Sequence, residues 1–593
     1  MQCDVNVRIA VLATLNSRVV SYFARVLSQD IKFRGGYVEQ VPRPSTLGGI
    51  DESLVDKITE LKRRELEHNT IEKEFTHPGD LDRSTEVIRH TLEGLLESQV
   101  FAAYDINAAV TATVLGKVGS PAGWFPLVSG YENTSALIAA AGLEDTSGSA
   151  AHLKAALQQC KRLDLDTVSL LRLKTRLRQI YEAGPGIDQP DEGDAISDDE
   201  EIVDRGKPIP TETFVEELSQ KLIIHPVSVY CLLEELKAEG ARCKPEELRL
   251  LEDQLSVLVL RLLGHQWPGQ FESDESVPAW AVADGISPLS AGAGAPSLAD
   301  RLRERLRVDR GDLGAQHVEA LLTELTGQNL EIWLRRAFFP RHVRQFKYRP
   351  IAWHMASTPM SLSGTKGKNN NGKSGSRQVP AFECLVYYHA SGLSLLARLR
   401  TQYVEPLLRA ERGRVDVSRQ AGDDTATAQA TARVQELEAF IERLRGVEER
   451  GFDTPDLEGA LSGEPLDRWS GDGILAPASR DALLAQERAW VVDLNDGVRV
   501  NIAPVQLAGV LASDVLKGAD ANKALDDRAR WRADERRWVR EGVLPRCGWM
   551  AQDIPASPRW VERAPEREVE RRKLEQKRAE AMTRLAQDDG GSE

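Results

Sequence analysis

Most of this 593-residue chain carries its apolar residues at helical spacing. Between residues 5 and 28, Val5, Ile9, Leu12 and Leu15 recur at intervals of three and four, which is the period of one face of an α-helix. Similar periodicity covers 51–76, 83–110, about 150–183, 211–264 and 421–450, whereas only short apolar segments such as PAFECLVYYH are typical of strands. The sequence therefore predicts a mainly α fold with small α+β parts.

Two polar connections interrupt this helical pattern. The first, 185–209, is rich in Pro, Gly and acidic residues, and the second, 268–297, is rich in Gly, Pro and Ser. In the N-terminal half we expect an N-terminal unit at 1–50, a helical domain at 51–184, an acidic linker at 185–209, a second helical domain at 210–267 and a linker at 268–297. In the C-terminal half we expect a basic α+β domain at 298–415 with a flexible loop at 361–379, a helical arm and a turn at DGV within 416–520, and charged C-terminal helices at 521–593.

Composition narrows the class of protein. Hydrophobic residues make up 41% of the chain and charged residues 28%, but no apolar run approaches the 18 residues or so that span a bilayer. The first residues, MQCDVNVRIAVL, lack the basic start and cleavage site of a signal peptide, so we expect a cytoplasmic protein without a membrane partner. Six cysteines without a CxxC pair and ten scattered histidines predict no metal site.

Two further motifs are weak evidence for phosphate binding and for calcium binding. The run GTKGKNNNGKSGS ends like a phosphate-binding loop at Gly372-Lys373-Ser374, but it has no preceding apolar strand, which favours a flexible basic loop. The run DLNDGVRVN resembles half of a calcium loop, but its twelfth position is Pro504 rather than Glu. A structural turn, with Gly497 supplying positive φ, is the favoured interpretation.

The net charge of −15 hides two opposite regions. Residues 188–204 hold nine acids and no base, while residues 331–414 hold 15 Lys or Arg and four acids. Within 333–354, basic residues alternate with aromatic ones, an arrangement that fits phosphate neutralisation and base stacking. The same pattern also fits core aromatics beside solvated bases, and the sequence leaves both interpretations open. The candidate phosphate contacts are Arg335, Arg336, Arg341, Arg344, Lys347 and Arg349, with loop residues Lys366, Lys368, Lys373 and Arg377, and Arg34 beside the Gly35–Gly36 turn.

Several segments together resemble a known family. LATLNSRVVSYFARVLSQDIKFRGGYVEQVPRP resembles the end of the target-recognition domain in Eco57I-like, type IIG-related adenine methyltransferases. LRRAFFPRHVRQFKYRPIAWHM, FECLVYYHASGLSLLARLRTQYVEPLL and LNDGVRVNIAP resemble the C-terminal region of PglX-type methyltransferases of BREX phage-defence systems, from about residue 8 to 540. The family's catalytic (N/D)PP(Y/F) loop and Gly-rich cofactor turn are missing, since no NPP or DPP tripeptide occurs. No catalytic residue can be assigned.

The resemblance implies a DNA-recognition and partner-binding portion of an S-adenosylmethionine-dependent, adenine-specific DNA methyltransferase. Residues 1–50 would then close a target-recognition domain, and a Rossmann-like methyltransferase domain would be absent from this chain. The expected partners are double-stranded DNA, a missing N-terminal methyltransferase half and other BREX-like defence subunits. No cofactor is expected in this chain, although the complete enzyme would use S-adenosylmethionine. The alternative is a non-catalytic helical scaffold that binds other defence proteins. Without the missing half, Ile9, Leu12 and Val19 should lack partners.

Overall fold

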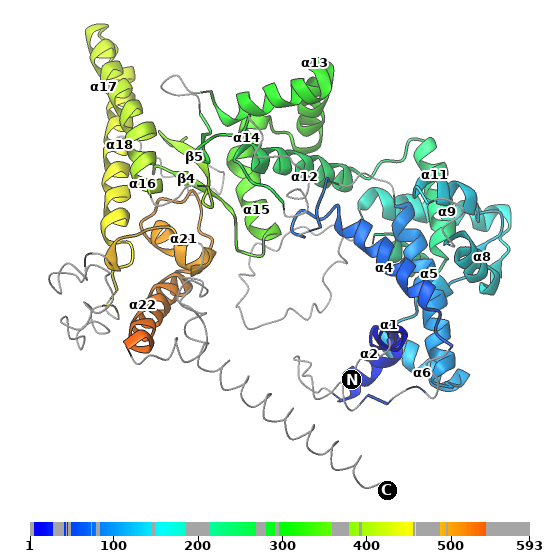
Figure 1. The fold of residues 1–593 in the computed structure, drawn as a ribbon. Helices are drawn as coiled ribbons and strands as arrows, with labels where there is room; N and C mark the ends of the chain where they lie inside the picture. The colour runs from blue at the N-terminus through cyan, green and yellow to red at the C-terminus, as the bar shows by residue number, and fades with distance from the viewer. Residues whose placement is uncertain are drawn as a thin grey trace, which may run out of the picture. The chain divides into compact units, whose positions relative to one another are not determined.

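The structure is a computed structural model of the whole chain. It describes residues 5–27, 41–42, 44, 49–72, 74–78, 83–143, 149–184, 214–267, 280–290, 296–358, 379–390, 394–454, 457, 485, 487–493 and 496–540. These residues are mostly helical and include two small sheets, which confirms the predicted mainly α fold with small α+β parts (Figure 1). None of the described helices is long and apolar enough to cross a membrane.

The chain divides into two compact units. Unit 1 comprises residues 1–257, 267–275 and 321–327, and unit 2 comprises 258–266, 276–320 and 328–593. The domain boundaries expected from composition stay a prediction, and the acidic linker 185–209 and the helix expected at 564–587 lie outside the described residues.

Unit 1 begins with two helices where the apolar spacing predicts one. α1 (Val5–Leu15) and α2 (Arg18–Leu27) are separated at Asn16 and Ser17. The Ser17 hydroxyl donates to the Thr14 carbonyl at 2.6 Å and accepts from the Val20 N–H at 3.3 Å, so it caps the start of α2. A polar Leu-Asn-Ser break thus divides a continuous apolar pattern.

The three residues expected to lack partners behave differently. Leu12 is 52% exposed, as expected, and Ile9 is partly buried. The prediction for Val19 is wrong, because Val19 is 1% exposed and belongs to a core that includes Val55 and Phe101. The turn at Ser17 rotates α2 so that Val19 packs inside this unit.

The core of unit 1 is built around α5 (Ser84–Ala103), which is buried on most sides. α4 (Glu52–Leu66) and a 3₁₀ turn, η1 (Ala122–Trp124), pack against α5, and α6 (Ala108–Val118) packs against α2. A Cβ atom on Gly123 would lie 2.7 Å from the His90 carbonyl oxygen, so this approach requires glycine. The Trp124 indole N–H donates to the Gly94 carbonyl at 2.7 Å and fixes the turn.

The rest of unit 1 continues this helical packing. β1 (Leu127–Val128) and β2 (Arg162–Leu163) form a short parallel pair. The helices are α7 (Thr134–Ala140), α8 (Ser149–Gln159), α9 (Thr167–Ala183), α10 (Phe214–Leu222), α11 (Pro226–Ala238) and α12 (Lys244–Leu262), the last of which ends in residues assigned to unit 2.

Unit 2 contains a three-stranded antiparallel sheet in the order β3-β5-β4. β5 (Glu383–Tyr387) falls within PAFECLVYYH, where the sequence predicts a strand, and it pairs with β4 (Ala352–Ala356). β3 (Ile286–Pro288) lies inside 268–297, which composition indicates is a linker. It escapes sequence analysis because it is three residues long and holds one large apolar side chain among Ser and Pro.

The helices of unit 2 include two hairpins. α13 (Leu298–Thr326) turns sharply at Gly311, whose φ is 72°, and Arg303 donates to Glu319 at 2.8 Å across the two halves. α17 (Glu405–Gln420) and α18 (Asp424–Arg450) form the predicted helical arm. The remaining helices are α14 (Leu330–Trp333), a π-helical turn η5 (Leu334–Phe338), α15 (Phe339–Gln345), α16 (Leu395–Arg398), a second π-helical turn η7 (Leu399–Val404), α21 (Val498–Leu507) and α22 (Gly518–Arg540).

The DLNDGVRVN motif is a structural turn, as predicted. Gly497 has a φ of 80° and immediately precedes α21. The Asn501 side-chain amide accepts from the Asp493 N–H at 2.9 Å and donates to the Asp493 carbonyl at 2.6 Å. These bonds join Asn501 to Asp493 across the turn, and no group of metal-ligating side chains occurs among the described residues.

Candidate nucleic-acid interface and an interhelical pocket

The aromatic residues of the basic segment belong to the core of unit 2. Trp333, Phe338, Phe339 and Trp353 are each fully buried, and the Trp353 ring stacks on Tyr388 at 4.6 Å between centroids. These four rings cannot stack on nucleic-acid bases in this conformation. Of the two interpretations of the aromatics, the core interpretation holds for them.

His342 ties α15 to the sheet. Its Nε2 accepts the backbone N–H groups of Ile351 and Ala352, each at 3.1 Å, at the start of β4. Burial lowers the pKa of His342 to about 3, so the ring is neutral and can accept these bonds. This histidine therefore has a structural role in placing the basic helix.

Arg335 and Arg341, both predicted phosphate contacts, have hydrogen-bond partners inside the unit. Arg335 donates to the Ser290 hydroxyl, and its Nε lies 3.5 Å from the carboxylate of Glu383, which is 4% exposed. Arg341 donates to the Gln345 side chain at 3.3 Å. Arg335 in particular balances a buried carboxylate that also lies 3.4 Å from His354 Nε2, so removing Arg335 would weaken the compensation of Glu383.

The other four described candidates are exposed. Arg336 lies on the π-helical turn, Arg344 on the last turn of α15, and Lys347 and Arg349 in the turn that follows. These four exposed bases lie on one short stretch of the sequence, between residues 336 and 349. Arg34, Lys366, Lys368, Lys373 and Arg377 lie outside the described residues.

The turn after α15 holds two non-glycine residues in the left-handed region. Lys347 has a φ of 49° and Tyr348 a φ of 58°. Their N–H groups donate to the carbonyls of Arg344 at 2.9 Å and Val343 at 2.8 Å, the bonding pattern of a helix end that glycine normally occupies at its first left-handed position. A side chain there costs about 1 kcal/mol or more relative to glycine.

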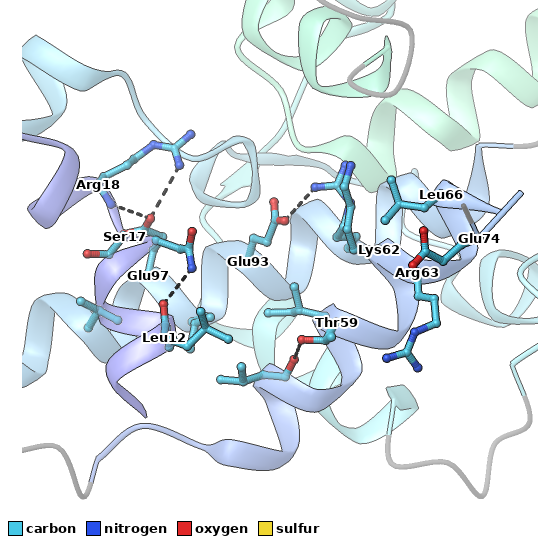
Figure 2. A pocket seen from close by; sticks show the side chains of 17 residues that line it. Leu12, Ser17, Arg18, Thr59, Lys62, Arg63, Leu66, Glu74, Glu93 and Glu97 are labelled. Atoms are coloured by element: carbon cyan, nitrogen blue, oxygen red, sulfur yellow. Dashed lines mark hydrogen bonds and ion pairs between the residues drawn. The ribbon is translucent and has the colours of Figure 1, made fainter. Parts of the chain in front are cut away.

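A separate pocket of about 570 Å³ lies in unit 1 (Figure 2). α1, α4 and α5 contribute most of its walls, and Figure 2 shows Leu12, Glu93 and Lys62 lining it from these three helices. Its lining mixes aliphatic side chains with charges of both signs: Leu12, Ala13, Asn16, Ser17, Arg18, Val55, Ile58, Thr59, Lys62, Arg63, Leu66, Glu74, Arg89, Glu93, Leu96, Glu97 and Val100.

The charged groups deepest in this lining already have internal partners. The Glu93 carboxylate accepts from Arg89 at 2.7 Å and lies 3.1 Å from His90 Nδ1. Burial opposes its ionisation, but these two partners outweigh burial and lower the pKa of Glu93 to about 2. Glu97 accepts the Arg18 N–H at 2.9 Å, and burial raises the pKa of Glu97. Glu93 therefore stays ionised and is unsuited to act as a general base near neutral pH.

The hydroxyl groups of the pocket are also engaged. Ser17 donates to the Thr14 carbonyl, and Thr59 donates to the Val55 carbonyl at 2.9 Å. Neither hydroxyl is hydrogen-bonded to a base in the described part of the chain, so the arrangement offers no activated nucleophile. The described lining of the pocket offers polar and aliphatic groups for binding and no catalytic geometry.

Sequence analysis did not identify the polar face of α5 that borders this pocket. Glu86, His90, Glu93 and Glu97 recur every three or four residues within a helix that also buries Val87, Ile88, Leu92 and Leu95. The Glu86 carboxylate accepts the Val215 N–H at 2.7 Å and so bonds to the first turn of α10. Burial raises the pKa of Glu86 to about 7 against the opposing charge of Arg83. Helical spacing of acids inside an apolar helix is the signal that could have revealed it.

Sequence analysis also missed a helix–turn–helix in unit 1, formed by α10 and α11. Ile223, in the turn, has a φ of 55°, and its N–H donates to the Ser219 carbonyl at 2.7 Å. In DNA-binding examples the second helix of such a motif enters the major groove. Here the start of α11 is buried: His225 and Ser228 are fully buried, and the Ser228 hydroxyl bonds to backbone groups of Tyr131 and Val128. This motif therefore does not present α11 to DNA.

Comparison with known proteins finds a partial similarity to adenine-specific methyltransferases. The matching protein is the adenine-specific methyltransferase BrxX of Escherichia coli O9:H4 (strain HS), which is 27% identical over 154 residues. The match covers 26% of this chain and 11% of BrxX, so the chain matches about a tenth of the length of this curated relative. No family model matches the chain.

This similarity agrees with the coarser part of the sequence resemblance, namely the relation to adenine-specific methyltransferases. It extends over about a quarter of the chain, whereas the resemblance inferred from motifs runs from about residue 8 to 540.

Proposed function

We propose that this chain supplies DNA contacts and partner contacts to an S-adenosylmethionine-dependent, adenine-specific DNA methyltransferase of a BREX-like phage-defence system. In this proposal the cofactor pocket and the catalytic loop belong to another part of the enzyme, because the (N/D)PP(Y/F) motif does not occur in the sequence. The partial similarity to BrxX supports the class of enzyme. The exposed bases Arg336, Arg344, Lys347 and Arg349 support the DNA contact.

The observation that carries the DNA contact is the left-handed conformation of Lys347. A glycine at this position would relieve the backbone strain, yet the chain places a lysine there and exposes it. Strain of this kind persists where the side chain has a use. Arg336, Arg344 and Arg349 lie on the same short stretch, and one use that all four share is phosphate binding.

The helix dipole also favours basic residues at the end of α15. α15 ends at Gln345, and cationic side chains near a helix C-terminus are favoured by about 0.3–1 kcal/mol. This effect explains Arg344 but does not require a lysine in place of glycine at 347. Stability and DNA affinity therefore have to be measured on the same variant.

The test is a salt titration of the full chain with a fluorescently labelled DNA duplex, read by fluorescence anisotropy. Four phosphate contacts predict that log affinity falls with log salt with a slope of about −3 to −4. Lys347→Gly should weaken binding to all sequences and reduce this slope by about 1, while it raises the free energy of unfolding.

Ile223→Gly is the matched control, because it relieves the same left-handed strain in unit 1 without removing a charge. It should leave DNA affinity unchanged. Unchanged DNA affinity in Lys347→Gly would refute the assignment of this surface. Calorimetry that detects tight S-adenosylmethionine binding by this chain would refute the proposal that the cofactor site lies elsewhere.

A further inference from the structure

The outer side of α9 carries exposed aliphatic side chains. Val168 is 58% exposed and Leu171 is 65% exposed, although α9 packs through its other side on α10 and α11. They are spaced three residues apart on one face of the helix. Single exposed aliphatic residues are ordinary, but two neighbours on one helix face form the start of a contact surface.

The turn between α10 and α11 adds a third exposed aliphatic residue. Ile223 is 63% exposed and has a φ of 55°. A β-branched residue is a true outlier in this conformation, and glycine is the unstrained choice. The side chain gains little from burial within the unit, so burial does not compensate for the strain. Backbone strain at an exposed apolar residue indicates a use for that side chain outside the unit.

One hydrogen bond places this turn beside α9. The guanidinium of Arg176, which lies on the exposed side of α9, donates to the carbonyl of Lys221 at 3.1 Å, two residues before Ile223. The end of α10 therefore lies alongside the outer side of α9. We name the surface made by Val168, Leu171, Arg172, Arg176, Lys221 and Ile223 the α9 face.

The charge of the α9 face is positive. Between Thr167 and Gln179 the exposed residues of α9 include Arg172 and Arg176 and no acid, whereas the exposed Lys221 beside the turn is ion-paired with Glu217. The acids of α9 and its approaches lie at its ends, where Asp166 caps the first turn and Glu182 pairs with Arg178 at 2.8 Å. Aliphatic side chains flanked by cations complement an acidic segment that carries its own aliphatic residues.

We propose that the α9 face is a docking surface for an acidic amphipathic helix of a partner protein. The aliphatic side of the helix would cover Val168, Leu171 and Ile223, and its carboxylates would face Arg172 and Arg176. Recognition of one helix by an apolar surface with a charged border follows a common mode of peptide binding. The proposal does not depend on the DNA contact of unit 2, so either can fail alone.

The test uses the full chain and two synthetic helical peptides, one with leucine on one side and glutamate on the other, and one with lysine in place of every glutamate. Fluorescence anisotropy should show saturable binding of the Leu/Glu peptide and at least tenfold weaker binding of the Leu/Lys peptide. Leu171→Ser should weaken Leu/Glu binding at least fivefold, and Ile223→Gly should weaken it while leaving the chain folded. The matched control is Leu313→Ser, since Leu313 is 83% exposed but lies on α13 in unit 2, and it should change nothing.

Absence of saturable Leu/Glu binding would overturn the proposal, as would equal binding of both peptides. An equal loss in Leu171→Ser and Leu313→Ser would also overturn it, because the effect would then not belong to the α9 face. A second copy of this chain is the other candidate to cover the α9 face, and sedimentation of the wild-type chain and of Leu171→Ser tests it. A self-associated chain that Leu171→Ser converts to a monomer would overturn the proposal in favour of contact between two copies.

Discussion

The substitution Glu86→Gln tests the polar face of α5. Glu86 is 3% exposed and accepts the Val215 N–H at 2.7 Å, and its second carboxylate oxygen has no hydrogen-bond partner among the described residues. Arg83 and His90 are near but not hydrogen-bonded to it, at 3.7 and 3.8 Å. A glutamine keeps the shape and can still accept from Val215, so the substitution removes the charge with little other change.

The magnitude follows from the pKa. Burial raises the pKa of Glu86 from 4.5 to about 7. The folded state then holds a proton that the unfolded state releases, so stability falls as the pH rises from about 4.5 through about 7 and is constant above that range. At about 1.4 kcal/mol per pH unit, the ionised carboxylate costs about 3 kcal/mol at pH 8. Glu86→Gln should therefore stabilise unit 1 by up to that amount at pH 8 and have little effect at pH 4.5.

Hydrogen–deuterium exchange in urea, read on peptides from α5 and α10, measures the opening free energy of unit 1 at each pH. The matched control is Glu182→Gln, because the Glu182 side chain is 42% exposed in an ion pair within α9. This substitution should change the opening free energy by less than about 0.5 kcal/mol at every pH. A difference between Glu86→Gln and wild type that does not grow with pH would refute the reasoning. Destabilisation at pH 8 would do so more strongly, because it would mean that Arg83 makes the charged form favourable.

Three further predictions concern the backbone and a buried histidine of unit 1. Gly123→Ala should destabilise by about 2–3 kcal/mol in urea denaturation, because the new Cβ would lie 2.7 Å from a carbonyl oxygen, whereas Gly116→Ala, where no atom lies within 4 Å, should stabilise by about 0.5–1 kcal/mol. Ile223→Gly should raise the free energy of unfolding by relieving the left-handed strain. Ile224→Gly, at a position 2% exposed, should lower the free energy of unfolding by more than about 2 kcal/mol. Burial lowers the pKa of His225 to about 3, so its contribution is complete above pH 6.5 and is lost as the pH falls toward 3, and circular dichroism should show a loss of stability in that range that His225→Gln reduces.

Much of the fold follows from the sequence because helical periodicity is a local signal. The arm at 421–450 is a helix with Leu437, Phe440 and Leu444 buried on one face, as its spacing predicts. The predicted helix boundaries are wrong where one or two residues interrupt a longer apolar periodicity. Ser17 divides a continuous apolar run and turns Val19 inward, and Gly311 folds α13 back on itself. Such turns depend on backbone angles that a periodicity count does not contain.

The candidate site was predictable in part. The basic segment could be located from charge alone, but charge did not separate Arg335, which balances buried Glu383, from exposed Arg336 beside it. That separation depends on the phase of the π-helical turn and on a strand partner 48 residues away in the sequence. The left-handed conformation of Lys347 was also hidden, because Pro350 favours a helix end nearby but does not determine the backbone angles of the residues before it.

Lys347 and Ile223 pose the same physical question in two units. Each is an exposed side chain held where glycine would be unstrained, so each costs stability that the fold itself does not recover. If both side chains serve binding, the two glycine variants should both raise stability but lose different ligands: Lys347→Gly the DNA duplex, and Ile223→Gly the acidic helix. A variant that gains stability and loses neither ligand would show that its strain is not explained by binding. The two variants measured against both ligands thus separate function from incidental strain, because a general loss of structure cannot produce opposite selectivities in more stable proteins.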